Sequence, residues 1–454
     1  MKLVIENLGV IKQAEIDLNK KFILFCGRNS TGKTYASYIL HAFIWDSNFF
    51  TFSYSKDIIS QIETKGSFII SKEIIEEWLN ANCKNIINSL SSIFGISDTT
   101  KEKLFSKFLL SASYSDEDFK QLILTPITIK LSDWVITKKA NSDEITLTES
   151  NADLTLQSNK VIQSEALIGY ILRNLAFFGM TGVRMLTVER NSIYTFKTEL
   201  SLSRNELIDQ IQQTNKSEIN IIDIINKSSR RYPLAIRSSL KIANDLENIQ
   251  KFSSPFAEVA TQIEQNLLNG EVSITKDGDV EFHPQSMARS KGLPFHLSSS
   301  IIKTMASLVI YLRHIAKKGD TLIIDEPEMN FHPDVQILLA RVFAMLSSKG
   351  LRMVVSTHSD YIIREINNLI MAGAINKHKG SQLIEEIGYA TDMLLDYKDV
   401  SVLYFDFKKR NVQVKSLDID EEGFAVDSID EAINRQNEDA YRLSAELEDC
   451  KSNS

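Results

Sequence analysis

The chain has 454 residues, 43% of them hydrophobic, and its three scattered cysteines exclude a cysteine-based zinc site and favour a reducing compartment. The net charge is −8, and the segment from Asp418 onward has twelve acidic and three basic residues, so the charge of residues 1–417 sums to about +1. A nearly neutral body argues against a protein that coats nucleic acid non-specifically. No stretch approaches the ~20 apolar residues of a membrane helix and the N-terminus lacks signal-peptide order, so we expect a soluble cytoplasmic protein without a membrane partner.

The first informative stretch is FILFCGRNSTGKT, residues 22–34. Residues 22–26 predict a buried strand, and the apolar spacing after residue 34 predicts a helix. Between them lies G-x-x-x-x-G-K-T, the pattern of a phosphate-binding loop, in which Lys33 would reach the β- and γ-phosphates and Thr34 would bind Mg²⁺. The predicted nucleotide-binding residues are Gly27, Arg28, Asn29, Ser30, Thr31, Gly32, Lys33, Thr34 and Tyr35.

The middle of the chain, residues 51–284, is predicted to be a large, mainly helical insertion after a first unit at 1–50. Alternating residues predict a β-hairpin near 126–149, and we expect a return to the first unit near 180–195. A polar helical stretch follows without sustained heptads, so no long coiled coil is expected. Its basic cluster is either a solvated helix face or a contact for nucleic acid or an acidic partner; the cluster is Lys227, Arg230, Arg231, Arg237 and Lys241.

Three serines, Ser298, Ser299 and Ser300, precede a predicted amphipathic helix. One interpretation is an ordinary serine N-cap. The other is a phosphate contact, because hydroxyls and free N–H groups at a helix start bind phosphate, including one held by another subunit. The segment alone leaves both open.

Two further predicted strands end in polar residues. Residues 321–324 form a short apolar strand with Asp325 and Glu326 at its carboxyl end, and the next apolar strand ends near His358. Asp325 is placed to hold Mg²⁺, Glu326 to orient and deprotonate the attacking water, and His358 to sense the γ-phosphate. Three strand ends that converge on one phosphate group indicate a nucleotide hydrolase.

After His358 the sequence predicts a β-hairpin over 401–419 and an acidic tail helix in 418–454. The tail carries one apolar stripe opposite an acidic face. Docking of that stripe on the chain's own body is the default interpretation. The alternative is a surface for a basic partner protein.

In order and spacing, these motifs resemble the ATPase heads of the ABC superfamily, in the branch that includes SMC, RecF and OLD-type proteins. The phosphate loop matches Walker A, "LSSS" at 297–300 matches the signature motif, Asp325 and Glu326 match Walker B, and His358 matches the switch histidine. "FHPD" at 331–334 matches the D-loop, and Glu189, Arg190 and Asn191 are the candidates for the Q-loop region. The resemblance implies an α/β fold, an ABC-type P-loop ATPase head with a mixed central sheet flanked by helices and a mainly helical insertion.

The resemblance also implies the cofactors ATP and Mg²⁺ and a homodimer or higher homo-oligomer in which two heads enclose two ATP molecules. The head would comprise 1–50 and 285–417, and the partner's Ser298, Ser299 and Ser300 would close each site. The chain departs from the pattern at Ser300, which stands where the signature motif has glycine. The implied catalytic residues are Glu326, His358 and Lys33, and the implied metal ligands are Thr34 and Asp325.

OLD-type nucleases add a Toprim domain of about a hundred residues, but only 96 residues follow His358, so we expect no nuclease domain. A head of this kind with a large insertion is similar to the ATPase subunits of two-gene anti-phage systems, such as PtuA of Septu and AriA of PARIS. That resemblance implies a sensor or scaffold that controls a separate effector, a nuclease or toxin. The alternative is a RecF- or SMC-like DNA repair or maintenance ATPase that clamps DNA.

Overall fold

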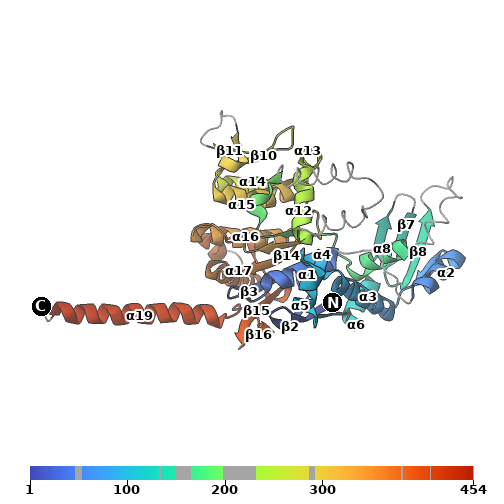
Figure 1. Cartoon of the computed structure of the whole chain (residues 1–454), viewed down its shortest axis with the longest axis horizontal. Coiled ribbons are helices and arrows are strands. Elements are labelled where there is room, and N and C mark those ends of the chain that lie inside the picture. Colours follow the sequence, from blue (N-terminus) through green and yellow to red (C-terminus); the bar gives the residue numbers. More distant parts are fainter. Residues whose placement is uncertain are drawn as a thin grey trace.

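The computed structural model describes residues 1–45, 54–131, 134–149, 165–197, 232–285, 292–379, 382–408 and 411–452. Within these residues, a nine-stranded mixed sheet in the order β5-β1-β2-β16-β15-β3-β14-β13-β9 forms the centre of the molecule (Figure 1). The predicted fold class, a mixed central sheet flanked by helices, is confirmed. In sheet order the strands are Leu109–Ser113, Lys2–Leu8, Ile11–Asp17, Asn411–Ser416, Val400–Lys408, Phe22–Gly27, Arg352–Thr357, Thr321–Asp325 and Val183–Leu186.

The strands of one half of the sheet run parallel. β3 pairs in parallel with both β15 and β14, β14 pairs with β13, and β13 pairs with β9. Because parallel strands share their direction, the carboxyl ends of β3, β13 and β14 lie at one edge of the sheet. The phosphate loop, Asp325 and His358 therefore follow neighbouring strand ends, although the chain between the first two is almost 300 residues long.

Both faces of this parallel half are covered, which explains why its strands are apolar throughout. Helix α1 (Lys33–Trp45) covers one face, where Phe25 of β3 belongs to the same buried cluster as Phe43. Helices α16 (Pro333–Ser348) and α17 (Asp360–Lys379) cover the other, where Leu24 clusters with Phe343. Successive side chains of a strand point to opposite faces, so β3 contributes to two cores and is buried along its whole length.

A first lobe is built on the α1 side of the sheet from residues 54–149. It combines a four-stranded sheet, order β4-β8-β7-β6, with five helices in its described residues. The strands are Ser67–Ile69, Glu144–Glu149, Trp134–Lys138 and Ile127–Lys130, and the helices α2 to α6 are Ser55–Lys65, Lys72–Asn88, Leu90–Phe94, Asp98–Phe105 and Asp116–Leu124.

Strand β5 corrects the predicted boundary of the insertion. Residues 109–113 pair antiparallel with β1 and form one edge of the main sheet, whereas they were predicted to belong to the insertion at 51–284, with a return to the first unit only near 180–195. The pattern was missed because β5 is a five-residue edge strand, LLSAS, with a half-exposed, partly polar sequence. The other edge strand, β9 at 183–186, also comes from the middle of the chain and pairs with β13.

A second lobe lies near the β9 edge (Figure 1). Helix α12 packs against β9, and helix α15 packs against the short helix α9 that follows β9. A small antiparallel sheet, β10-β11-β12, completes the lobe. The bounds are α9 Arg190–Ile193, α12 Leu234–Asn244, α13 Leu246–Ile249, α14 Ala257–Ile263, β10 Gly270–Ile274, β11 Val280–Pro284, β12 Leu293–Pro294 and α15 Ser300–Ile310. Helix α8 (Glu165–Ala176), which precedes β9, packs instead against α2, α3 and β6 of the first lobe.

The acidic tail forms helix α19 (Asp427–Ser452), which extends away from the body of the molecule (Figure 1). Its described side chains from residue 435 to 447 are all exposed, and Leu443 of the apolar stripe keeps 71% of its surface accessible. The default interpretation, that the stripe docks on the chain's own body, is therefore wrong for this part of the helix. Among the described helices, α19 included, none is both long and apolar enough to cross a membrane.

Candidate functional site

The phosphate loop connects β3 to α1. Gly27 has φ 133° and Gly32 has φ 91°, both in the region that favours glycine. A Cβ atom at Gly27 would collide with the backbone of Phe405, and one at Gly32 would lie 2.8 Å from Ile11. The two glycines therefore allow the loop to lie against β15 and β2 while it turns into the helix.

Lys33 is folded inward against this loop. Its side chain is only 5% exposed, and Nζ donates hydrogen bonds of 2.9 Å to the carbonyl oxygens of Gly27 and Arg28. Burial lowers the pKa of Lys33, while the carboxylates of Asp325 and Glu326 oppose that shift. An ammonium group held by two carbonyl oxygens can exchange them for phosphate oxygens with little rearrangement.

The Thr34 hydroxyl donates a 2.7 Å hydrogen bond to Oδ2 of Asp325. Asp325 is 1% exposed, and its second oxygen, Oδ1, is buried and has no hydrogen-bond partner among the residues that the structure describes. Burial is the main cause that raises the pKa of Asp325. An orphaned carboxylate oxygen beside a threonine hydroxyl fits Mg²⁺, which binds proteins through one or two such oxygens and takes its other ligands from phosphates and water.

Glu326 follows Asp325 in a backbone conformation that is rare for residues other than glycine, with φ 46°. Its N–H donates to the carbonyl of Ser356 on β14 at 2.8 Å. Arg190 holds the same turn from the other side, because its guanidinium donates to the carbonyl oxygens of Asp325 and Glu326, both at 2.7 Å. Burial lowers the pKa of Arg190 to about 10, with Asp325 acting against the shift.

Arg190 was one of three candidates for the Q-loop region. The structure places it as a buried brace of the turn after β13, and it leaves Glu189 exposed and Asn191 half-buried at the start of α9.

Glu328 is a site residue that sequence reasoning missed. Its Oε1 accepts hydrogen bonds from the Thr357 hydroxyl at 2.7 Å and from the His358 N–H at 2.8 Å, and lies 3.1 Å from Nδ1 of His358. The His358 side chain is 42% exposed and lines a cavity of about 450 Å³ together with Glu326 and Glu328. The sequence feature that could have identified Glu328 is the second glutamate of "DEPE", two positions after Glu326, close to the strand end that precedes His358.

The three serines lie at the start of α15. Ser299 and Ser300 are exposed, while Ser298 is buried with a hydroxyl that has no hydrogen-bond partner. Ser299 occupies the N-cap position, yet its side chain makes no capping hydrogen bond. In the structure these hydroxyls are therefore not used as an ordinary N-cap.

Other predicted residues are placed as follows. Arg28, Asn29 and Ser30 form the exposed tip of the phosphate loop, and Thr31 is buried with its hydroxyl bonded to the Arg28 carbonyl. The ring of Tyr35 packs edge-on against Phe94 and Phe105, in a hydrophobic cluster of the first lobe. In the basic cluster, Arg237 and Lys241 lie on α12, and Lys227, Arg230 and Arg231 fall outside the described residues.

Residues 1–363 match the family model described as "AAA ATPase domain". The match is one span that includes the phosphate loop, the strand ends at Asp325 and His358 and the whole segment between them, whereas the sequence resemblance rested on two separated pieces. No curated protein matches the sequence.

Among solved structures, the chain is similar to an SMC head bound to the C-terminal winged-helix domain of ScpA, with 12% identity, TM-score 0.34 and coverage of 92% of this chain and 98% of that one. It is also similar to a Pyrococcus furiosus SMC head with an extended coiled coil, bound to the C-terminal domain of ScpA. Here the identity is 12% and the TM-score 0.35, and the match covers 96% of this chain and 98% of that one. For the SMC head domain from Thermotoga maritima the identity is 9% and the TM-score 0.30, and the match covers 92% of this chain and 98% of that one. These likenesses are too distant to add to the fold and site described above.

Proposed function

This chain belongs to the AAA ATPase domain family, and we propose that it hydrolyses ATP where the phosphate loop meets the ends of β13 and β14. The observation that carries the proposal is the contact between Thr34 and Asp325, with the second Asp325 oxygen free and buried. In this arrangement Lys33 binds the β- and γ-phosphates, and Thr34 and Asp325 hold Mg²⁺, which neutralises phosphate charge.

Glu326 and His358 face the same cavity from neighbouring strand ends. Glu326 orients the attacking water and accepts its proton, because its carboxylate follows directly on the residue that holds the metal. His358 contacts the γ-phosphate and is positioned by Glu328, which accepts from its backbone N–H. Arg190 fixes both acidic residues through their carbonyl oxygens and so limits the motion of the turn.

A second copy of the chain completes each site in this proposal. Ser299 and Ser300 are exposed, and within the described residues no hydrogen bond joins them to the phosphate loop of their own chain. Their hydroxyls, and the free N–H groups at the start of α15, are available to a nucleotide held by another head. ATP binding then joins two heads, and hydrolysis releases them.

The ATPase is the sensor or scaffold subunit of an anti-phage complex in this proposal, similar to PtuA of Septu and AriA of PARIS, and it controls a separate nuclease or toxin. Helix α19 supports this part of the proposal, because it presents exposed leucines beside acidic residues, a surface that suits a basic partner protein. The chemistry in this chain is ATP hydrolysis, and the effector acts in trans.

The test is a pull-down of Glu326→Gln protein with ATP from its native host, followed by identification of bound proteins and nucleic acid. A stoichiometric nuclease or toxin, lost when residues 427–454 are deleted, is the expected result. In infected cells, Lys33→Ala should remove protection while the partner's own active site is intact. Full protection by Lys33→Ala would contradict the defence role.

The alternative is a DNA-clamping ATPase of RecF or SMC type. In that function the basic cluster contacts DNA. Two of its residues, Arg237 and Lys241, line a cavity. It predicts ATP hydrolysis that is stimulated by DNA and falls steeply with salt. Bound DNA without a protein partner in the pull-down would favour this function.

A further inference from the structure

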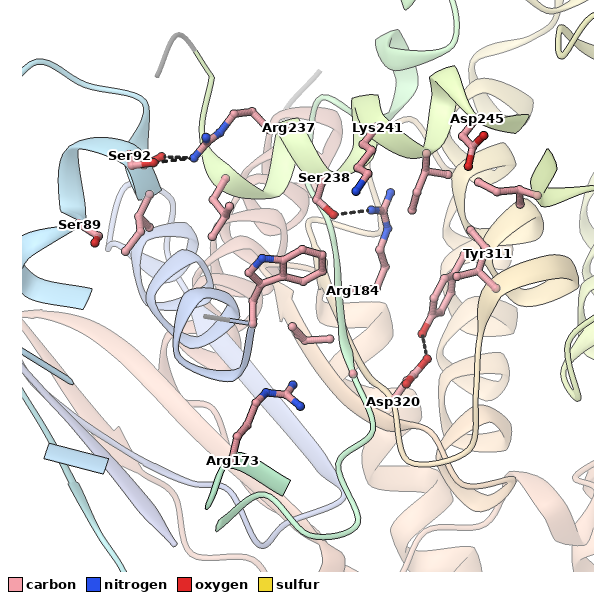
Figure 2. A pocket seen from close by; sticks show the side chains of 18 residues that line it. Ser89, Ser92, Arg173, Arg184, Arg237, Ser238, Lys241, Asp245, Tyr311 and Asp320 are labelled. Carbon is pink, nitrogen blue, oxygen red and sulfur yellow. Dashed lines mark hydrogen bonds between the residues drawn. The ribbon is translucent and has the colours of Figure 1, made fainter. Parts of the chain in front are cut away.

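A second cavity, of about 750 Å³, lies at the β9 edge of the sheet (Figure 2). Its volume is typical of sites for small organic ligands. The walls come from the end of α1, from α4, α8, β9, α12 and α13, and from the segment between α15 and β13. It is therefore enclosed by elements from both lobes and the central sheet.

The cavity is separate from the ATP site. Gly182 and Asp320, which line it, immediately precede β9 and β13, whereas Asp325 ends β13. Five residues of extended chain span about 16 Å, so the two sites lie at opposite ends of the same strand. This separation means that a ligand in the cavity does not compete with ATP for the phosphate loop.

Four cationic side chains line the cavity: Arg173 from α8, Arg184 from β9, and Arg237 and Lys241 from α12. Within the described residues, the hydrogen bonds of the three arginines go to uncharged oxygens, and none of the four cations forms an ion pair with a carboxylate. The two lining aspartates have other partners, because Asp320 accepts from Thr181 and Tyr311 and Asp245 accepts from Asn248. The lining therefore has four positive and two negative side chains, an excess of two positive charges.

The arginines have donors to spare. Arg184 is 6% exposed, and its only hydrogen bonds to described residues go to the hydroxyls of Ser238 and Ser239, at 3.1 and 3.0 Å. Arg237 bonds to the carbonyl and hydroxyl oxygens of Ser92, both at 2.8 Å. The Nε atoms of Arg173, Arg184 and Arg237 are all buried without a hydrogen-bond partner. Burial lowers the pKa of each of these arginines, so a bound anion would relieve the cost of their desolvation.

The chemistry of these groups favours phosphate. Guanidinium groups bind phosphate oxygens bidentately, and serine hydroxyls and a lysine at the exposed mouth add further donors. Beside them, the cavity has an apolar wall that includes Trp45, Ile93 and Ile242. An indole with an exposed face is a stacking surface for a nucleobase.

We propose that this cavity binds a nucleoside phosphate, with the phosphate at Arg184 and Lys241 and the base against Trp45. The site is distinct from the one that hydrolyses ATP and does not rest on the proposed function. A nucleoside phosphate can come from two sources: a free nucleotide, or the phosphorylated end of a nucleic-acid strand.

The test measures binding directly, by calorimetry and by tryptophan fluorescence, with the full chain carrying Lys33→Ala and with Trp78 and Trp134 replaced by Phe in the fluorescence measurement so that Trp45 alone reports. The probes are the four 5′-mononucleotides, which lack the β- and γ-phosphates that Lys33 contacts, and a short single strand with and without a 5′-phosphate. We expect saturable binding of at least one probe that carries a 5′-phosphate and no saturable binding of the strand that has only phosphodiester groups. Binding by a mononucleotide assigns a free ligand, and binding by the phosphorylated strand alone assigns a strand end.

Arg184→Gln should weaken that binding at least tenfold, and Lys241→Gln, at the mouth of the cavity, severalfold. Lys84→Gln is the matched control, since Lys84 is an exposed lysine of α3 that does not line the cavity. Because Arg184 is buried, Lys241→Glu provides a second test in a variant that should fold normally. Absence of binding by every probe, or equal affinities in the cavity variants and Lys84→Gln, would overturn the proposal.

Discussion

The hydroxyl of Thr34 and the carboxylate of Asp325 are 2.7 Å apart although 291 positions separate them in the sequence. Asp325 ends the buried strand β13 and Thr34 lies in the helix that follows the buried strand β3, and β14, which pairs with both strands, brings the two strand ends together. The contact joins the phosphate loop to the acidic strand end, and so the site exists only when the central sheet is complete.

Asp325→Asn should abolish Mg²⁺-dependent ATP hydrolysis, because the amide keeps the size of the side chain but removes the negative charge that holds the metal. ATP binding without Mg²⁺ should persist, since Lys33 and the loop glycines are unchanged. Turnover and nucleotide binding, each measured with and without Mg²⁺, check this prediction. Turnover within twofold of the unaltered protein would exclude Asp325 as a metal ligand.

Glu326→Gln should lower the rate of ATP hydrolysis by roughly 10²-fold or more, because the amide cannot accept a proton from the attacking water. ATP then persists, and we expect a stable closed dimer by light scattering after gel filtration. Adding Ser299→Ala and Ser300→Ala should weaken that dimer, because the proposed contacts to the other head's nucleotide are lost. The same oligomer with and without ATP would contradict ATP-driven pairing.

Glu328→Gln should lower kcat about tenfold with little change in KM, because His358 loses the carboxylate that positions it 3.1 Å away. The matched control is Glu365→Gln, which removes a buried carboxylate that accepts from Arg341. The control should lower the melting temperature without changing kcat of the folded protein. If both variants behave alike, Glu328 is structural.

His41 makes stability depend on pH. It is buried with both ring nitrogens unpaired among the described residues, and burial, aided by the charge of Arg184, lowers its pKa to about 3. Between about pH 6.5 and 3 the unfolded chain therefore binds a proton that the folded chain does not, so the free energy of unfolding falls as pH falls, by up to about 1.4 kcal/mol per pH unit.

Urea unfolding of the unaltered protein and of His41→Phe, at several values between pH 7 and 5, measures this dependence. The variant should show a shallower decline of the free energy of unfolding toward low pH. Identical slopes would show that His41 does not contribute.

Deletion of residues 427–454 should leave the melting temperature and the ATPase rate unchanged, because the described side chains of α19 from 435 to 447 are exposed. A charge-preserving variant, Leu443→Ser with Leu447→Ser, tests the apolar stripe alone. Thermal melts and ATPase assays on the purified chains check the prediction. A drop of several degrees on deletion would show that α19 packs on the body in solution.

Much of the site was predictable, because Gly27, Asp325 and His358 each follow an apolar strand and parallel strand ends converge at one edge. The edge strand β5 was harder, since its sequence is short and its partner is chosen by tertiary pairing. Arg190 and Glu328 act through backbone groups of residues distant in the sequence, and no local pattern marks such contacts. The basic cavity was not foreseen because its arginines come from three separate elements.

Strand β3, residues 22–27, has both of its neighbours, β14 at 352–357 and β15 at 400–408, in the last third of the chain. At ordinary rates of protein synthesis, the ribosome needs roughly 20 to 70 s to make the intervening residues. During that time a fully apolar strand has neither of its parallel partners. The nascent chain is therefore expected to need a chaperone that shields β3, and a slow translation rate should increase aggregation of the protein.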